Sequence, residues 1–251
     1  MNRVTLGILG GLGPMSGILF CEMLTEHTKA DCDQDHLNFL LSSRADTPDR
    51  TAFILGQSED NPTSVMIDEV KKLVSAGADM IAIPCNTAHY FYESIADASD
   101  VPVINIIHKT VDFCRFCEYT KVGVISTGGT AASGAYKDVI ESAGIEYDTC
   151  TPEEQQIITD IIYNEIKRGK RPNVEKFMSV ANAMRERGAQ AIVLGCTELS
   201  ILKRNYELGD GFVDSLEVLA ATAIRLLGKE PVGFDSSLMN FTPRKEDIYV
   251  T

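Results

Sequence analysis

Two cysteines stand at matching places in a stretch of sequence that occurs twice. Residues 77–86 (GADMIAIPCN) align without a gap with residues 188–197 (GAQAIVLGCT), and Cys85 and Cys196 each follow a short apolar run. Such runs predict buried parallel strands, and the ligands of open α/β sheets gather beyond the carboxyl ends of strands. We therefore expect both thiols at ligand-binding strand ends.

Two thiols that face one cleft from opposite sides are suited to inverting a stereocentre. A thiolate can remove a proton from one face of a carbon atom, and a thiol can return a proton to the opposite face. The ordinary thiol pKa of about 8.5 is close enough to neutral for either role, and the pair would share one proton. The alternative is two inert buried cysteines, because free cysteines are often simply core residues. The matched positions weigh against that alternative.

Polar residues directly follow each cysteine. Asn86 and Thr87 follow the first, and Thr197 and Glu198 follow the second. Such side chains are good hydrogen-bond partners for a carboxylate and for the oxygen of a developing enolate. The charge of Glu198 would also raise the pKa of the second thiol, which favours a role as proton donor.

Strand-like and helix-like segments alternate along the chain. Eight segments predict strands: residues 4–9, 37–42, 80–83, 103–104, 121–126, 146–148, 191–194 and 212–213. Apolar residues at helical spacing predict helices over residues 63–75 and 215–227. A third helix is expected to begin at Pro152, behind the N-cap Thr151, and to run to Gly169. This alternation predicts an α/β fold with mainly parallel sheets flanked by helices.

The internal repeat predicts two pseudo-symmetric lobes with the active site in the cleft between them. Residues 1–112 are expected to form the first lobe and residues 113–212 the second, with a crossover near residues 109–120. The final helix, residues 213–228, has no partner in the repeat and is expected to rejoin the first lobe. Residues 229–251 read as an irregular tail with a short terminal strand.

Composition narrows the class of protein. The chain has 251 residues, of which 44% are hydrophobic and 24% charged, as in ordinary globular proteins. Its 36 acidic residues outnumber 23 basic ones, for a net charge of −13, which argues against a nucleic-acid partner. No membrane span or leader peptide is evident, so we expect a cytoplasmic protein without a membrane partner. Its seven cysteines, an odd number, favour free thiols.

A glycine-rich segment, GGLGP at residues 10–14, follows the first predicted strand. It lacks the third glycine of a dinucleotide fingerprint and the Gly-Lys-Ser/Thr ending of a phosphate loop. We interpret it as a tight loop whose backbone amides approach a substrate carboxylate, with Met15 nearby.

Other candidate residues carry weaker signals. Cys114 and Cys117 have the spacing of a redox or zinc pair, but no second pair completes a zinc site, so no metal is expected. His36 and His89 could orient site groups, although histidines beside strand ends are more often hydrogen-bonded scaffold. No lysine lies in a recognisable pyridoxal context.

Several segments together resemble the aspartate/glutamate racemase family, and specifically its aspartate racemase branch. They are GGLGP at residues 10–14, DQDH at 33–36, PDRT at 48–51, PCNTAH at 84–89 and GCTEL at 195–199. The resemblance extends from about residue 4 to residue 227. It implies racemisation of an acidic amino acid, without a cofactor, by two cysteines between pseudo-symmetric lobes. Members are commonly homodimers.

The resemblance also implies roles for individual residues. Cys85 and Cys196 correspond to the acid/base pair. Arg50 corresponds to a clamp on the side-chain carboxylate, which a guanidinium can grip with two bonds. Lys167 corresponds to a second cationic partner, although a cation in the last turn of a helix is favoured by the dipole in any case. The residues implied to hold the α-amino and α-carboxylate groups are Asn86, Thr87, Thr127, Thr130 and Thr197.

The leading hypothesis is a racemase that interconverts L- and D-aspartate. Glutamate or a broader range of amino acids is an alternative substrate. A decarboxylase or isomerase could reuse the same cleft, although two cysteines argue against a one-thiol decarboxylase. From a different class, a non-catalytic amino-acid sensor could close the two lobes on the same ligand.

Overall fold

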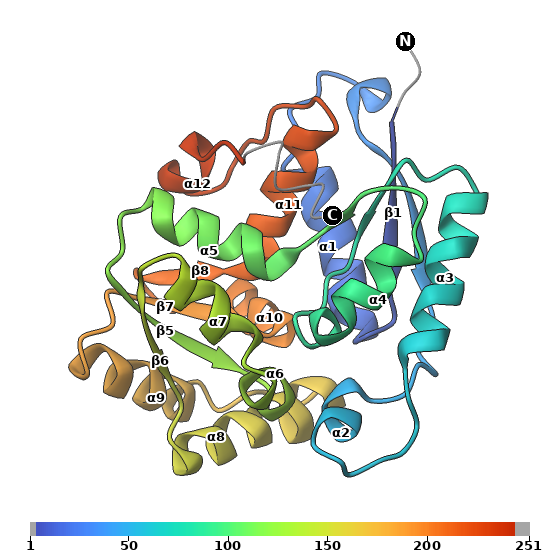
Figure 1. Ribbon diagram of the computed structural model, residues 1–251. Helices are drawn as coiled ribbons and strands as arrows, with labels where there is room; N and C mark the ends of the chain where they lie inside the picture. The colour runs from blue at the N-terminus through green and yellow to red at the C-terminus, as the bar shows by residue number, and fades with distance from the viewer. Residues whose placement is uncertain (1–3, 244–251) are drawn as a thin grey trace.

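Two parallel four-stranded sheets organise the computed structural model, which describes residues 4–243 (Figure 1). The first sheet has the order β2-β1-β3-β4 and the second the order β6-β5-β7-β8. The strands are β1 (Thr5–Gly10), β2 (Asn38–Ser43), β3 (Met80–Ala82), β4 (Val103–Ile104), β5 (Lys121–Ser126), β6 (Glu146–Thr149), β7 (Ala191–Gly195) and β8 (Phe212–Asp214). All eight predicted strands are confirmed to within one residue at each end, and helices flank both sheets as expected.

The helices follow the strands in a similar sequence in each half. The first half contains α1 (Pro14–Glu26), α2 (Arg50–Ile54), α3 (Thr63–Ser75), η2 (Thr87–Phe91), α4 (Tyr92–Asp97) and α5 (Ile106–Phe116), with the short turn η1 (Asp33–Asp35). The second half contains α6 (Gly128–Ser133), α7 (Ala135–Ser142), α8 (Pro152–Thr159), η3 (Asp160–Glu165), η4 (Ile166–Arg168), α9 (Val174–Glu186), α10 (Thr197–Asn205), α11 (Ser215–Leu226) and α12 (Ser236–Asn240).

Equivalent glycines let a helix approach each sheet closely. Gly7 in β1 and Gly123 in β5 occupy corresponding places in the two halves. A Cβ atom at Gly7 would lie 3.3 Å from the Leu73 Cβ atom of α3, and one at Gly123 would lie 3.3 Å from the Met184 Cβ atom of α9. A side chain at either place would crowd the neighbouring helix, so the repeat is visible in packing as well as in strand order.

The helix expected from Pro152 to Gly169 begins as predicted but changes pitch. Thr151 is the N-cap as predicted, and it forms a capping box with Glu154. At Asp160 the helix widens into the π-helical turn η3, and it then tightens into the 3₁₀ turn η4, which ends at Gly169 with φ of +67°. Apolar spacing specifies the buried face of a helix but not such a local change in pitch, and π-turns are frequent at functional sites.

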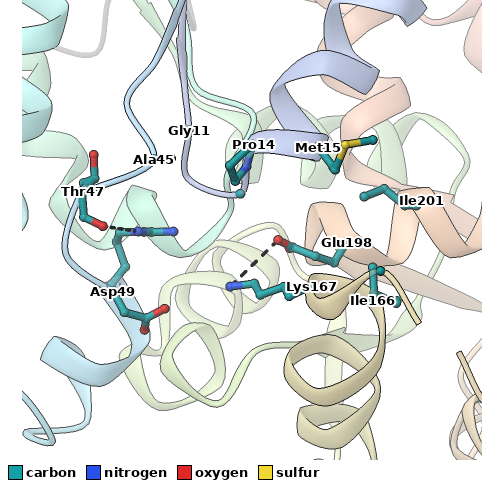
Figure 2. A pocket seen from close by; sticks show the side chains of 13 residues that line it. Gly11, Pro14, Met15, Ala45, Thr47, Asp49, Ile166, Lys167, Glu198 and Ile201 are labelled. Atoms are coloured by element: carbon teal, nitrogen blue, oxygen red, sulfur yellow. Dashed lines mark hydrogen bonds and ion pairs between the residues drawn. The ribbon is translucent and has the colours of Figure 1, made fainter. Parts of the chain in front are cut away.

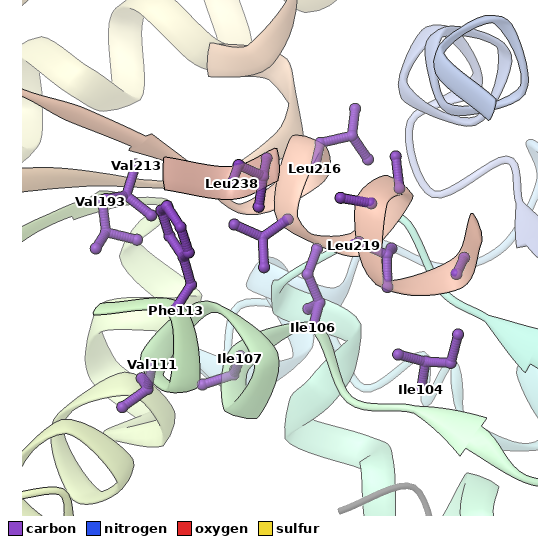
Figure 3. Close-up of a cluster of buried hydrophobic side chains, with 14 of the residues drawn as sticks. Ile104, Ile106, Ile107, Val111, Phe113, Val193, Val213, Leu216, Leu219 and Leu238 are labelled. Carbon is purple, nitrogen blue, oxygen red and sulfur yellow. The ribbon is translucent and has the colours of Figure 1, made fainter. Parts of the chain in front are cut away.

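The largest apolar cluster joins the two sheets rather than serving one of them. It includes Leu6 and Ile8 of β1 and Val193 of β7, together with residues of α5 and α11. Helix α5 leaves the first sheet and packs on α7 and β8, whereas α11 leaves the second sheet and packs on α1 and α5. Figure 3 shows side chains of α5 and α11 meeting in this cluster.

The segment after α11 is more ordered than the expected irregular tail. Its helix α12 lies beside α11, where Arg225 donates hydrogen bonds to the carbonyl oxygens of Leu238 and Met239 at 3.0 and 2.7 Å. Phe241 packs edge-on against Phe113 of α5. These contacts bury apolar side chains of a segment that reads as polar overall. The expected terminal strand falls in residues 244–251, outside the described residues.

Over residues 4–243, none of the helices combines the length and the apolar character needed to cross a bilayer.

Candidate active site

Cys85 and Cys196 line the same small cavity, at the carboxyl ends of β3 and β7. Both residues are almost entirely buried, and the cavity is tight, with a volume of about 10 Å³. It is lined by Leu12, Asp49, Arg50, Thr51, Cys85, Asn86, Thr87, Thr127, Tyr163, Lys167, Cys196, Thr197 and Glu198. The two thiols therefore meet one shared space, one from each half of the repeat.

Hydrogen bonds between the two halves hold the cysteine segments against each other. The Thr197 hydroxyl donates to the carbonyl oxygen of Pro84 at 3.3 Å, which ties the residue after one cysteine to the residue before the other. Asn86 donates to the Ser215 hydroxyl at 2.9 Å and accepts a bond from the Tyr136 hydroxyl at 2.7 Å. The Asn86 side chain thus anchors the first cysteine segment to α7 and α11 while lining the cavity.

The Cys196 thiol donates a hydrogen bond to the Glu198 carboxylate, from Sγ to Oε2 at 3.0 Å. Burial, followed by the charge of Glu198 and this bond, raises the pKa of Cys196 well above the ordinary thiol value, and Lys167 partly opposes the rise. Glu198 thus acts on the pKa of Cys196 in the direction that its position in the sequence predicts.

Lys167 extends from η4 toward Glu198. Its Nζ atom lies 3.9 Å from Glu198 Oε1 and 4.2 Å from the centre of the Tyr163 ring. Burial disfavours the charged ammonium group, but the charges of Glu198, Tyr163, Cys196 and Asp49 together outweigh this, so the pKa of Lys167 is raised overall. The π-turn η3 and the 3₁₀ turn η4 present Tyr163 and Lys167 to the cavity from one helical path.

Arg50 borders the cavity, and its hydrogen-bond partners are backbone carbonyl oxygens. Its guanidinium donates to Leu12 O at 2.7 Å, Pro48 O at 3.0 Å and Thr47 O at 3.3 Å. The Nε atom is buried and has no hydrogen-bond partner within residues 4–243. Arg50 itself is 6% exposed, and no carboxylate of the described chain forms an ion pair with it. It is a buried cation whose hydrogen-bond partners in the described chain are neutral carbonyl oxygens.

Three threonine hydroxyls form a closed triangle beside the cavity. Thr87, Thr127 and Thr130 bond to one another at 2.9 to 3.0 Å. Thr87 and Thr127 line the cavity, whereas Thr130 lies behind them and orients their hydroxyl groups. Thr127 is also the N-cap of α6, so its oxygen accepts a bond from the Thr130 amide.

His89 is a scaffold residue, which was the simpler of its two expected roles. The Ile106 amide donates to Nε2 at 3.1 Å, so Nδ1 carries the proton and donates to the carbonyl oxygen of Cys85 at 2.9 Å. Burial lowers the pKa of His89 to about 4, so the ring is neutral near pH 7. It supports the backbone of the catalytic candidate without reaching the cavity.

A wider outer cavity, with a volume of about 590 Å³, adjoins one end of the inner cavity, which we call its neck (Figure 2). The two share Asp49, Arg50, Lys167 and Glu198. Figure 2 shows Met15 and Ile201 on one side of the outer cavity and Thr47 and Asp49 on the other. Met15 therefore lies at this outer entrance, together with Gly11 and Gly13 of the glycine-rich loop, and not beside the thiols.

Sequence reasoning missed Asp49, Thr51 and Tyr163, which also line the inner cavity. Asp49 is the N-cap of α2 and accepts a bond from the Ala52 amide at 2.8 Å. Asp49 and Thr51 flank Arg50 in the sequence, and this position is a signal that could have identified both. Tyr163 gives no such signal, because its direction depends on the π-turn.

The other candidate residues lie away from this cavity. Burial raises the pKa of Cys114 far above the ordinary value, and Cys117 is half-buried, as expected of structural thiols. Within residues 4–243, no cluster of three or more histidine, cysteine or acidic residues is arranged to hold a metal.

Comparisons with known proteins agree with this geometry. A family model described as "Asp/Glu/Hydantoin racemase" matches residues 9–223. The chain is 28% identical over 233 residues to the broad specificity amino-acid racemase RacX of Bacillus subtilis, covering 87% of this chain and 96% of that one. It is 27% identical over 184 residues to a glutamate racemase of Aquifex aeolicus, covering 70% and 68% of the two chains. Among solved structures, an aspartate racemase of Picrophilus torridus superposes with a TM-score of 0.79 at 29% identity, covering 91% and 96%.

Proposed function

The chain belongs to the Asp/Glu/hydantoin racemase family and is an isomerase of that kind, and we propose that it interconverts L- and D-aspartate by exchanging the α-proton between Cys85 and Cys196. The observation that carries the proposal is the shared cavity: one thiol from each half of the repeat opens onto it. Two cationic side chains, Arg50 and Lys167, border the same space.

The proposed reaction balances without an added cofactor. One sulfur, as a thiolate, takes the α-hydrogen as a proton, and the electrons of the broken C–H bond pass into the substrate carboxylate to form an enolate. The opposite thiol then gives its proton to the other face of the carbon and becomes the thiolate. Proton exchange with water restores the first form of the enzyme.

The enolate must be stabilised, because the α-hydrogen is far less acidic than a thiol. Positioned hydrogen-bond donors each contribute on the order of 10²–10³-fold to such reactions. The hydroxyls of Thr87, Thr127 and Thr197 and the amide of Asn86 border the cavity and are our candidates for holding the α-amino and α-carboxylate groups. Thr130 would act indirectly, by orienting two of these hydroxyls.

The buried guanidinium supports an acidic substrate. Arg50 lacks an acidic partner in the described chain and keeps a buried Nε without a bond, and a second carboxylate on the substrate would supply one. Lys167 lies at the same neck. Similarity to the aspartate racemase of Picrophilus torridus supports aspartate as the substrate.

A broader substrate range is the second candidate, and the outer cavity favours it. Met15, Ile166 and Ile201 give that cavity apolar walls directly beyond the neck. Side chains longer than that of aspartate could extend into it. The broad specificity of the Bacillus subtilis relative and the glutamate racemases among the relatives agree with this second candidate.

Two further properties belong to the proposal. The seven cysteines are all free thiols, which suits the reducing conditions of the cytoplasm. A homodimer is implied by the family resemblance, and light scattering of the purified protein would measure its mass.

The experiment is incubation of the protein with each enantiomer of aspartate in deuterated water, without added cofactor. We expect deuterium at the α-carbon, which NMR measures. We also expect loss of optical activity, which chiral chromatography measures as a mixture of the two enantiomers. Cys85→Ser and Cys196→Ser should each lower racemisation at least 10³-fold, because the weakly acidic hydroxyl replaces a thiol. The structural thiol change Cys114→Ser is the matched control for loss of a sulfur atom.

The outcomes separate the alternatives. No exchange with any acidic or common neutral amino acid would overturn the racemase. A sensor would bind amino acids with unchanged affinity in both cysteine variants and never exchange deuterium. A decarboxylase would release carbon dioxide from a dicarboxylate instead.

A further inference from the structure

The two halves of the repeat differ at the second residue after each cysteine. The first half has Thr87 at this place, and its hydroxyl is bonded within the threonine triangle. The second half has Glu198, whose carboxylate accepts the S–H of Cys196 at 3.0 Å. The two halves therefore differ in charge at this position: the first has a neutral hydroxyl that is bonded to other threonines, and the second has an anion bonded to its thiol.

The carboxylate of Glu198 is fixed in place from several sides. Its side chain is 7% exposed, and it lies in the first turn of α10, where the helix dipole favours negative charge. A Cβ atom at Gly13 would overlap Oε1, so the glycine-rich loop closes directly over this group. Lys167 faces the same oxygen at 3.9 Å. The other titratable groups that border the inner cavity are Asp49, Arg50, Tyr163 and Cys85.

We propose that Glu198 is a positioning residue that keeps the shared proton on Cys196 in the free enzyme, so that Cys85 is the base and Cys196 the acid in the predominant form. This inference rests on the proposed two-thiol function. Lys167 is the counter-ion that limits the effect, since its positive charge favours the Cys196 thiolate. The enantiomer whose α-hydrogen faces Cys85 can react with the predominant form of the enzyme. The other enantiomer can react only with the minor form, in which Cys196 is the thiolate.

This asymmetry has a definite kinetic consequence. Enantiomers have equal free energies, so kcat/KM must be the same in both directions. The apparent affinity for a ligand falls by the fraction of enzyme that is competent to bind it. The enantiomer served by the minor form should therefore show a higher KM and, in the same proportion, a higher kcat. Glu198→Gln should bring the two KM values together.

The direct test is alkylation of the free enzyme by iodoacetamide over a range of pH, with Cys85 and Cys196 peptides quantified separately by mass spectrometry. Only the thiolate reacts readily, and the two side chains are about equally buried, at 6% and 4% exposed. We expect Cys85 to react faster at pH 8. Glu198→Gln should raise the rate at Cys196 about tenfold or more, which corresponds to a change of about one pKa unit.

Three further variants test whether the charge of Glu198 is the cause of the difference. Lys167→Met should slow alkylation of Cys196, which is the opposite sign. Asp49→Asn removes the same charge from the same cavity, but Asp49 contacts the Ala52 amide rather than a thiol, so it should change the rate at Cys196 much less. Glu198→Asp should restore part of the original selectivity. Circular dichroism verifies that each variant is folded.

The inference fails if the two cysteines react with the same pH midpoint in the unmodified protein, or if Glu198→Gln leaves the rate at Cys196 unchanged. Alkylation needs no turnover, so it separates this failure from failure of the proposed function. Racemisation with equally reactive thiols would overturn only the role of Glu198. Unequal thiols without α-proton exchange would overturn only the racemase.

Discussion

At the scale of single residues, Arg50 is the side chain that we expect to determine the choice of substrate. A buried charge without an opposite charge is costly in a protein, and the three carbonyl partners of Arg50 satisfy only part of its guanidinium. A substrate carboxylate would complete the set. Because the guanidinium is planar and offers several donors in a fixed arrangement, a lysine at this place would keep the charge but lose the paired bonds.

Arg50→Lys should therefore lower kcat/KM for aspartate more than for a neutral amino acid such as alanine. Loss of a hydrogen bond to a charged group costs about 1.5–3 kcal/mol, or roughly 10- to 150-fold in kcat/KM. Steady-state kinetics with both substrates measure the difference. Arg44→Lys is the matched control, because Arg44 lies nearby but pairs with Asp46 and Glu69. Equal losses for both substrates would contradict a carboxylate clamp.

At the scale of elements, helices α10 and α11 are joined by a charged pair behind the cavity. Lys203 of α10 donates to Glu217 of α11 at 2.7 Å. Burial, together with the charge of Asp214, raises the pKa of Glu217 to about 7, even though Lys203 opposes the rise. The pair links the helix that carries Glu198 to the helix that crosses to the other sheet.

Glu217 should make stability depend on pH in a particular direction. Its pKa is about 7 when folded and near 4.5 when unfolded, so between these values the folded protein binds more protons. Stability then falls as pH rises from 4.5 to 7 and stays reduced above 7. This loss amounts to roughly 2–3 kcal/mol in the free energy of unfolding between pH 4.5 and pH 7. Glu217→Gln should remove it.

Urea unfolding at pH 5 and pH 7.5 measures this loss as a difference in the free energy of unfolding between the two proteins. The exposed Glu186→Gln on α9 is the control for removal of one acidic charge. If the unmodified protein and Glu217→Gln lose stability equally over this range, the carboxyl at position 217 is not the group responsible.

At the scale of the whole molecule, the exchange of α5 and α11 between the sheets makes the two lobes one structure. The cluster around these helices contains residues from both sheets, and Leu219 of α11 is fully buried within it (Figure 3). A cleft whose walls share a core keeps its two sides at a fixed separation. That rigidity suits a reaction in which both sulfur atoms must reach one carbon atom.

Leu219→Ala should accordingly destabilise both lobes together, by about 2–5 kcal/mol, which is the usual cost of a cavity in a core. Pulsed alkylation along a urea titration reports on the lobes separately, because Cys85 belongs to one and Cys196 to the other. Both cysteines should become reactive at the same urea concentration, lower in the variant than in the unmodified protein. Leu55→Ala, at a position that is 40% exposed, is the control. Two separate transitions would contradict a shared core.

Local patterns in the sequence determined the elements of this protein and the most informative part of its site. The eight strands, the capping box at Thr151 and the position of both cysteines at strand ends all follow from the types of neighbouring residues. The repeat predicted two related sheets because a sequence duplicated over whole strand–helix units specifies the same local structure twice. The resemblance pointed to Arg50 and Lys167, and both border the cavity.

Only the tertiary structure decided which side chains share the cavity. Tyr163 reaches it because a helix changes pitch, Thr130 stays behind two other hydroxyls, and Met15 lies at the outer entrance. The lack of a repeat partner leads us to expect that α11 returns to the first half, but the packing of α5 on α7 and β8 of the second half has no such signature in the sequence. Strands, helices and caps are set by residues a few positions apart, whereas these distances result from the packing of two sheets against each other, to which residues far apart in the chain contribute together.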